Sequence, residues 1–213
     1  MDAKVVASFV INVAIVVFTA YSWLRLMFGK ASSKERLTAR GLRSLRYFTV
    51  LSNLLSGAVS LACIIAYAVG GPSLPAWALA IRLVAASEVM LTCIVVILLL
   101  VPVYGVGPMY RGGNLWMHLV LPLLAALDCC ALVPVGTLPW YATFLAAVPE
   151  ALYATYYLQG ILRHGAEEDG VVYDFYHFLR WGTDKIPLIC AASIVSTWVI
   201  ALGLYGLNLL VCG

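Results

Sequence analysis

The chain has 213 residues, of which 63% are hydrophobic and 11% are charged. Soluble globular domains carry about twice that charged share, so the composition excludes this class and indicates an integral membrane protein. The net charge of +3 at pH 7 reflects membrane topology and attraction to anionic lipid headgroups, and it predicts no nucleic-acid partner.

Six apolar segments are long enough to cross roughly 30 Å of hydrocarbon as helices. In chain order they cover residues 5–28, 46–69, 76–104, 115–134, 139–163 and 185–211. Because these segments use nearly the whole chain, residues 1–213 are predicted to form one all-α domain, a polytopic membrane protein of six transmembrane helices.

A basic linker after the first apolar segment predicts the orientation. Its seven basic residues, against the single acid Glu35, are Arg25, Lys30, Lys34, Arg36, Arg40, Arg43 and Arg46. Such an excess marks a cytoplasmic loop. The first segment lacks a cleavage site and is interpreted as a retained helix, so the N-terminus is expected outside and the loops at 105–114 and 164–184 inside.

The second segment opens with FTVLSN and carries a polar stripe. Thr49, Ser52, Asn53, Ser56 and Ser60 are spaced three or four residues apart, which places them on one face of a helix. That face is expected to contact protein or water. For Ser56 and Ser60 we favour simple helix packing.

The fourth segment contains the only histidine within a predicted span. Asn114 precedes His118 by one helical turn and is a candidate orienting partner for the imidazole. Pro122 cannot donate to the carbonyl of His118 and should loosen the helix there. Thr49 and His118 each lie in the first turn of a helix that enters from the same side, so they are expected at one membrane depth. A hydroxyl and its general base must meet this condition.

The buried charges divide into two groups. Arg82 and Asp128 lie at matched distances from the outer helix ends and are predicted to form a structural pair. Glu88 and Glu150 fall near the middle of their spans, where a carboxyl group must be protonated, paired or hydrated, and they could bind a cation or carry a proton.

Three further sets of residues have side chains that could form a site. Tyr153 and Tyr157 extend the face of Glu150 and could donate to it. Asp174 and His177 lie in an aromatic inner loop that suits the membrane interface, and they make only a weak metal site. The six cysteines form no cluster with metal-ligand spacing, so neither a metal nor a cofactor is predicted.

Four stretches resemble the androgen-induced protein family and its bacterial relatives. They are RYFTVLSNLL at 46–55, NLWMHLVLP at 114–122, ALYATYYLQG at 151–160 and VVYDFYHF at 171–178. Members of that family are six-helix membrane proteins. In the studied animal members a threonine and a histidine form the active site of an intramembrane hydrolase that cleaves fatty acid esters of hydroxy fatty acids.

The resemblance implies that Thr49 is the catalytic threonine and His118 the histidine. The expected reaction is hydrolysis of a lipid or amphiphilic ester near the cytoplasmic membrane face, with a site in the bacterial inner membrane. Asn53 could donate to the developing oxyanion and Asn114 could fix the imidazole tautomer. Further candidates for the substrate pocket are Ser52, Glu88, Glu150, Tyr153 and Tyr157.

Three alternatives stay open at the level of sequence. A small transporter or proton-coupled carrier would use Glu88 and Glu150, although the chain shows no internal repeat. An acyltransferase would use the same dyad and pass the acyl group to a lipid alcohol. A lipid-binding scaffold would use the stripe of the second segment for packing only. The oligomeric state is not predicted.

Overall fold

The computed structural model describes residues 2–29, 40–168 and 171–212, and nearly all of them are helical. The basic residues Lys30, Lys34 and Arg36, together with Glu35, lie outside the described residues. The long helices are α1 (Ala3–Phe28), α2 (Phe48–Gly70), α3 (Ala76–Val95), α8 (Ala147–His164) and α9 (Ile186–Cys212), and α7 (Leu121–Leu127) is the central part of a longer helical stretch, Gly113–Leu132.

Shorter elements connect or extend the long helices. Three short α-helices are α4 (Val101–Tyr104), α5 (Val106–Met109) and α6 (Gly113–Leu115). The π-helical turns are η2 (Val96–Leu100), η3 (Trp116–Val120) and η4 (Asp128–Leu132). The 3-10 turns are η1 (Gly41–Arg46), η5 (Val135–Thr137), η6 (Trp140–Ala146), η7 (Phe178–Trp181) and η8 (Thr183–Lys185), and one small antiparallel hairpin pairs β1 (Glu167–Glu168) with β2 (Val171–Val172).

Within the described residues, five helical stretches are long and apolar enough to cross a membrane. They are Ala3–Phe28, Phe48–Gly70, Ala76–Tyr104, Gly113–Leu132 and Thr183–Cys212. The protein is therefore an all-α membrane protein. The predicted segment 139–163 is also helical but is not among the five: it forms η6 followed by the 18-residue α8, which carries Glu150, Gln159 and Arg163.

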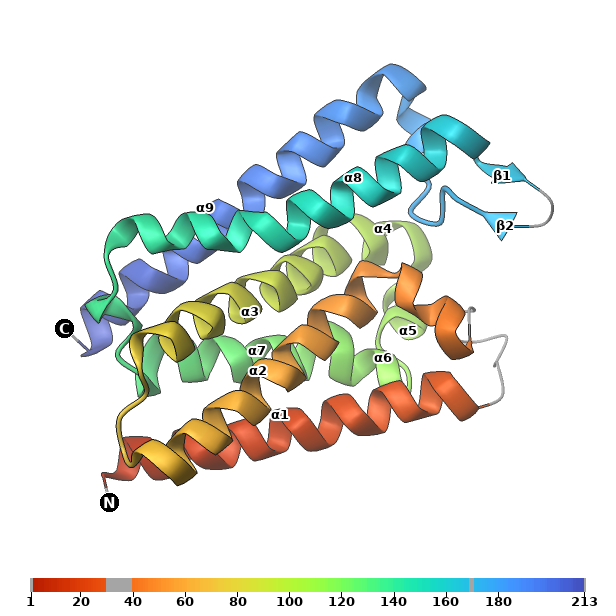
Figure 1. Ribbon diagram of the computed structural model, residues 1–213. Helices are drawn as coiled ribbons and strands as arrows, with labels where there is room; N and C mark the ends of the chain where they lie inside the picture. Colours follow the sequence, from red (N-terminus) through yellow and green to blue (C-terminus); the bar gives the residue numbers. More distant parts are fainter. Residues whose placement is uncertain (1, 30–39, 169–170, 213) are drawn as a thin grey trace.

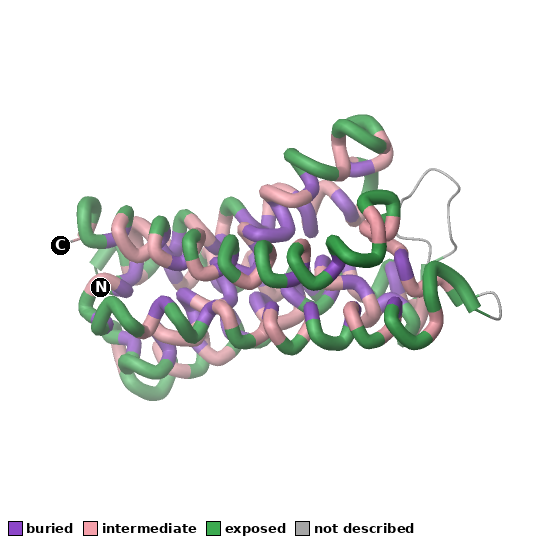
Figure 2. Tube along the Cα trace, turned by 90° about the horizontal axis from the view of Figure 1, so that it is seen from above, coloured by how far each residue is buried: buried purple, intermediate pink, exposed green. Residues whose placement is uncertain are grey.

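The long helices pack around α3, which contacts α2, α7, α8 and α9. Helices α1 and α2 lie against each other on one side of α3, and α8 runs alongside α9 on the other (Figure 1). Helix α1 begins and α9 ends at the same end of the bundle (Figure 1). Buried residues line the interior of this bundle, and its outer faces are exposed (Figure 2).

Two of the π-helical turns are explained by proline. Pro102 follows η2, and Pro122 follows η3. A proline nitrogen cannot donate to the carbonyl four residues earlier, so the regular ladder is interrupted and a wider turn forms in its place. His118 therefore lies in a π-helical turn, a type of turn that is frequent at functional sites.

The expected contact between Arg82 and Asp128 is present in the core. Both side chains are fully buried, and Nε of Arg82 lies 2.6 Å from Oδ2 of Asp128. Nη1 of Arg82 also donates to Oγ of Ser60 at 3.0 Å, and Nδ2 of Asn12 lies 3.5 Å from the same Asp128 oxygen. The network joins α1, α2 and α3 to the turn η4.

The segment between α8 and α9 folds back onto the start of α2. Nη1 of Arg46 donates to the carbonyl of Val172 at 3.3 Å, and the backbone N–H of Phe48 donates to the hydroxyl of Tyr176 at 2.9 Å. The end of the basic linker and the aromatic segment therefore lie at the same end of the bundle.

Candidate active site

Thr49 and His118 line one cavity of about 180 Å³. Thr49 lies in the first turn of α2 and His118 in η3, and both side chains are buried. Arg46, Tyr176 and His177 also line this cavity and add polar groups to its wall. Among the residues that the structure describes, no hydrogen bond joins the two side chains directly, so their approach within hydrogen-bond reach, or through one water, stays a prediction.

The imidazole of His118 is held by a backbone carbonyl. Its Nδ1 lies 2.7 Å from the carbonyl oxygen of Met109. A carbonyl can only accept, so Nδ1 carries the hydrogen, and Nε2 of the neutral ring keeps its lone pair. The tautomer is therefore the one that a general base at Nε2 requires.

This contact corrects the expected role of Asn114. Its Nδ2 donates to the carbonyl of Pro108 at 3.1 Å, and the partner of the imidazole is Met109 instead. The short helix α5 lies between Gly105 and Gly112, which both have positive φ values of 82° and 57°. This loop brings the carbonyls of Pro108 and Met109 over the start of the fourth span, where they accept from both side chains.

Asn53 does not have the expected role of a donor to the oxyanion. Its Nδ2 donates to the carbonyl of Thr49 at 2.7 Å and to the carbonyl of Met117 at 3.1 Å. Both amide hydrogens are therefore used, and none is left for an oxyanion. Asn53 instead fastens the turn that holds Thr49 to the turn that holds His118.

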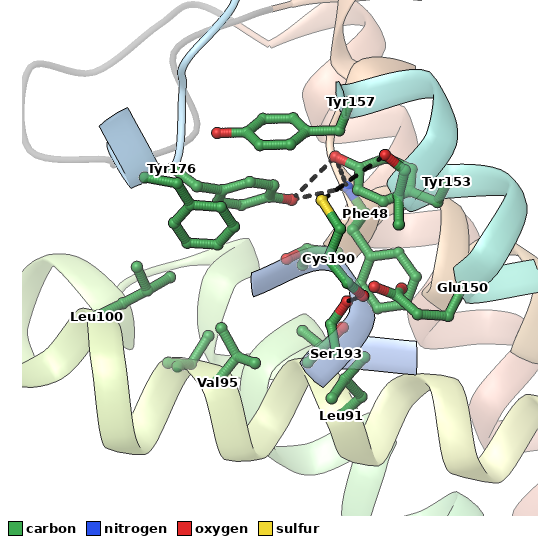
Figure 3. Close-up of a pocket in the computed structure, with 15 residues that line it drawn as sticks. Phe48, Leu91, Val95, Leu100, Glu150, Tyr153, Tyr157, Tyr176, Cys190 and Ser193 are labelled. Carbon is green, nitrogen blue, oxygen red and sulfur yellow. Dashed lines mark hydrogen bonds between the residues drawn. The ribbon is translucent and has the colours of Figure 1, made fainter. Parts of the chain in front are cut away.

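Tyr176 offers a hydrogen-bond donor for an oxyanion, which Asn53 does not. Its hydroxyl accepts from the N–H of Phe48 and lies 3.2 Å from the hydroxyl of Tyr153 (Figure 3). Tyr153 has a single hydrogen, for which the carbonyl of Arg46 at 2.9 Å and the oxygen of Tyr176 are both acceptors. The Tyr176 oxygen therefore accepts from Phe48 and Tyr153, and its own hydrogen is left for a ligand in the cavity. Burial raises the pKa of Tyr176, so this phenol stays protonated.

A second, mostly apolar cavity of about 70 Å³ adjoins the first. Thr49, Leu100 and Tyr176 line both cavities. The walls of the second include Leu91 and Val95 from α3 (Figure 3). Thr49 therefore lies where a polar cavity meets an apolar one.

Asp174 holds Tyr176 in place. Its carboxylate accepts from the hydroxyl of Tyr157 at 2.5 Å and from the backbone N–H groups of Phe178 and Leu179 at 2.8 Å and 3.0 Å.

The expectation that Tyr153 and Tyr157 donate to Glu150 is wrong, because these hydroxyls bind the Arg46 carbonyl and Asp174.

His177 takes a left-handed backbone conformation, with a φ of 58°. Such a value is uncommon for a residue other than glycine, and it turns the chain so that His177 lines the polar cavity. Among the described residues, no group of three or more His, Cys, Asp or Glu side chains is placed to hold a metal ion.

The other candidates for the substrate pocket, Ser52, Glu88 and Glu150, do not line the cavity that holds His118. Ser52 lies 3.0 Å from the hydroxyl of Thr92 and, together with Glu88, lines a third cavity of about 470 Å³. Glu150 lines the apolar cavity with Thr49. The structure thus brings Thr49, His118 and Glu150 to two adjoining cavities, and places Ser52 and Glu88 in a separate one.

In the sequence, Thr49 and His118 are marked as site residues by their shared membrane depth and their chemistry, whereas Tyr176 is marked only by its place in an aromatic run.

Comparison of the chain with protein-family models, with curated proteins and with solved structures finds no match.

Proposed function

We propose that the protein is an intramembrane lipid-ester hydrolase with Thr49 as nucleophile and His118 as general base. The observation that carries this proposal is the position of Thr49 at the junction of two cavities. One cavity holds the imidazole and polar groups, and the other is mostly apolar. An amphiphilic ester has the same division, with a polar group on one side of its carbonyl and a hydrocarbon chain on the other.

The reaction follows from the roles of three side chains. Nε2 of His118 takes the proton of the Thr49 hydroxyl as its oxygen attacks the ester carbonyl. The hydroxyl of Tyr176 donates to the developing oxyanion. Collapse of the intermediate breaks the ester bond, and the imidazolium returns its proton to the departing alcohol, which leaves an acyl-threonine.

A water molecule then completes the turnover. His118 removes a proton from this water as it attacks the acyl carbonyl, and the Thr49 oxygen leaves with that proton. The products are an alcohol and a carboxylic acid. An acyltransferase would differ only in this step, because a lipid alcohol would take the place of water.

The proposed setting is a six-crossing protein of the bacterial inner membrane with its N-terminus outside. Two observations support six crossings: α8 runs alongside α9, and α1 begins at the end of the bundle where α9 finishes (Figure 1). The basic residues near the start of α2 favour the cytoplasm for that end. The substrate would reach Thr49 from the cytoplasmic leaflet.

Labelling with an alkyl fluorophosphonate tests the nucleophile. The purified protein should be labelled, Thr49→Ala should abolish labelling, and His118→Ala should slow it about a hundredfold or more. Thr197→Ala is the matched control, since the Thr197 hydroxyl is buried in α9 and donates to the carbonyl of Ser193 at 3.0 Å. Ester hydrolysis at the native rate by folded Thr49→Ala would overturn the proposal. Analysis of the products with and without a lipid alcohol separates hydrolase from acyltransferase.

A carrier is the second candidate, favoured by the buried carboxyls of Glu88 and Glu150. Neither oxygen of Glu88 accepts a hydrogen bond from any residue that the structure describes. Proton flux into liposomes that is lost in Glu88→Gln and kept in Thr49→Ala would support this candidate over the hydrolase.

A further inference from the structure

The cavity that holds Glu88 is larger than the two cavities that Thr49 lines. It has a volume of about 470 Å³ and lies between the first half of α2, the middle of α3 and the face of α8 that carries Tyr153. Leu51, Leu152 and Tyr156 line it and are exposed. Since this outer surface of a membrane protein contacts lipid, the cavity opens sideways toward the hydrocarbon.

Glu88 brings a carboxyl group to this cavity. Its side chain is fully buried, and neither carboxyl oxygen has a hydrogen-bond partner among the described residues. A buried carboxylate without a partner is costly in a membrane protein. The nearest basic residue on the same helix, Arg82, is already engaged by Asp128. Glu88 is thus left available for a group that enters the cavity.

The walls specify which group fits. The rings of Phe48, Tyr153 and Tyr156 line the cavity together with leucines and the Ser52 hydroxyl. Aromatic faces attract cations, and leucines suit a hydrocarbon chain. A bare metal ion would need more oxygen or nitrogen ligands than this cavity offers, and no group of three such residues exists in the described part of the chain.

A second carboxyl group lies near the first. Glu150 on α8 interacts electrostatically with Glu88, and its Oε2 also has no partner among the residues that the structure describes. Two carboxyl groups on facing helices, with three oxygens that lack a partner among the described residues, favour a cationic occupant over an anionic or neutral one.

We propose that this cavity binds a lipophilic amine, whose ammonium group contacts the carboxylate of Glu88 while its hydrocarbon chain extends past Leu152 into the bilayer. The Ser52 hydroxyl and the rings of Tyr153 and Tyr156 complete the contacts of the ammonium group. The site is separate from Thr49 and His118, which do not line this cavity, and it does not depend on the hydrolase.

Equilibrium binding of radiolabelled dodecylamine to the purified protein in dodecyl maltoside micelles tests the site. Unlabelled dodecylamine should displace the label, whereas dodecanol and dodecanoate, which have the same chain length, should not. Glu88→Gln should weaken binding about thirtyfold or more, because the charge partner of a desolvated cation is removed. Tyr156→Leu should weaken it about threefold through loss of a cation–π contact.

Two controls keep this test decisive. Glu167→Gln removes a carboxylate from the exposed strand β1 and should bind dodecylamine as the native protein does, and Thr49→Ala should also bind normally whether or not the hydrolase proposal holds. Displacement by dodecanol as effective as by dodecylamine would overturn the site even if Glu88→Gln failed to fold. Native affinity in Glu88→Gln with an unchanged melting temperature would overturn it equally.

Discussion

Nδ1 of His118 donates to the carbonyl oxygen of Met109 over 2.7 Å, and this single contact separates the structural role of the side chain from the catalytic role that we propose for it. An asparagine at position 118 would keep a donor near the place of Nδ1 but has no group at the place of Nε2. We expect His118→Asn to melt close to the native temperature and to lose about 10²- to 10⁴-fold in the rate of ester hydrolysis.

His118→Leu is the companion variant. It removes both nitrogens and leaves the Met109 carbonyl buried without its partner, so it should lose stability as well as activity. The measurements are melting temperature in detergent and turnover of a p-nitrophenyl ester. Native turnover in His118→Asn would rule out a base at Nε2.

Tyr176→Phe tests the proposed oxyanion donor. The N–H of Phe48 keeps the Tyr153 hydroxyl as acceptor at 3.1 Å, so the variant should fold. Loss of one donor to the oxyanion typically lowers kcat about 10²- to 10³-fold, with little change in KM, because the contact strengthens only in the transition state. Tyr156→Phe, which removes a hydroxyl from the same aromatic region outside the polar cavity, should leave kcat unchanged. Equal kcat values for native protein and Tyr176→Phe would assign the hydroxyl to packing alone.

The sequence predicted those parts of the site that depend on helix period and membrane depth. Thr49 and His118 reach one cavity because they lie in the first and second turns of two helices that start at the same end of the bundle. The contact of Arg82 with Asp128 was predicted from their membrane depth, counted in residues from the outer helix ends, since two opposite charges at one depth in an apolar core are driven to pair.

The remaining parts depend on backbone groups and on loop docking. The Met109 carbonyl replaces Asn114 as the partner of His118 because a loop between two glycines with positive φ folds over η3, and a backbone acceptor has no signature in the sequence. Tyr176 reaches the cavity because Asp174 anchors its segment through Tyr157 and two N–H groups. Periodicity does not predict such a tertiary contact.

The buried pair of Arg82 and Asp128 predicts a thermodynamic cycle. Arg82→Met or Asp128→Leu alone should cost about 3–5 kcal/mol of unfolding free energy, since each leaves an uncompensated charge in the core. The double variant should recover a large part of this loss, because two apolar side chains need no partner. Denaturation of all four proteins in the same detergent gives the coupling energy. Losses that simply add in the double variant would mean that the two side chains do not stabilise one another.

The position of Thr137 relative to Val171 decides whether the η6–α8 segment crosses the membrane. Both residues are exposed, and they lie on either side of that segment. If it crosses, single cysteines at these two positions react with a membrane-impermeant maleimide from opposite sides. A cysteine at Arg43, in the turn η1, should react from the same side as one at Val171, because Arg46 of that turn donates to the Val172 carbonyl.

The six native cysteines must first be replaced. With the expected orientation, Thr137→Cys is labelled in intact cells, whereas Arg43→Cys and Val171→Cys are labelled only in inverted vesicles. Labelling of Thr137→Cys and Val171→Cys from one side would reduce the count to five crossings, and labelling of Arg43→Cys in intact cells would reverse the orientation.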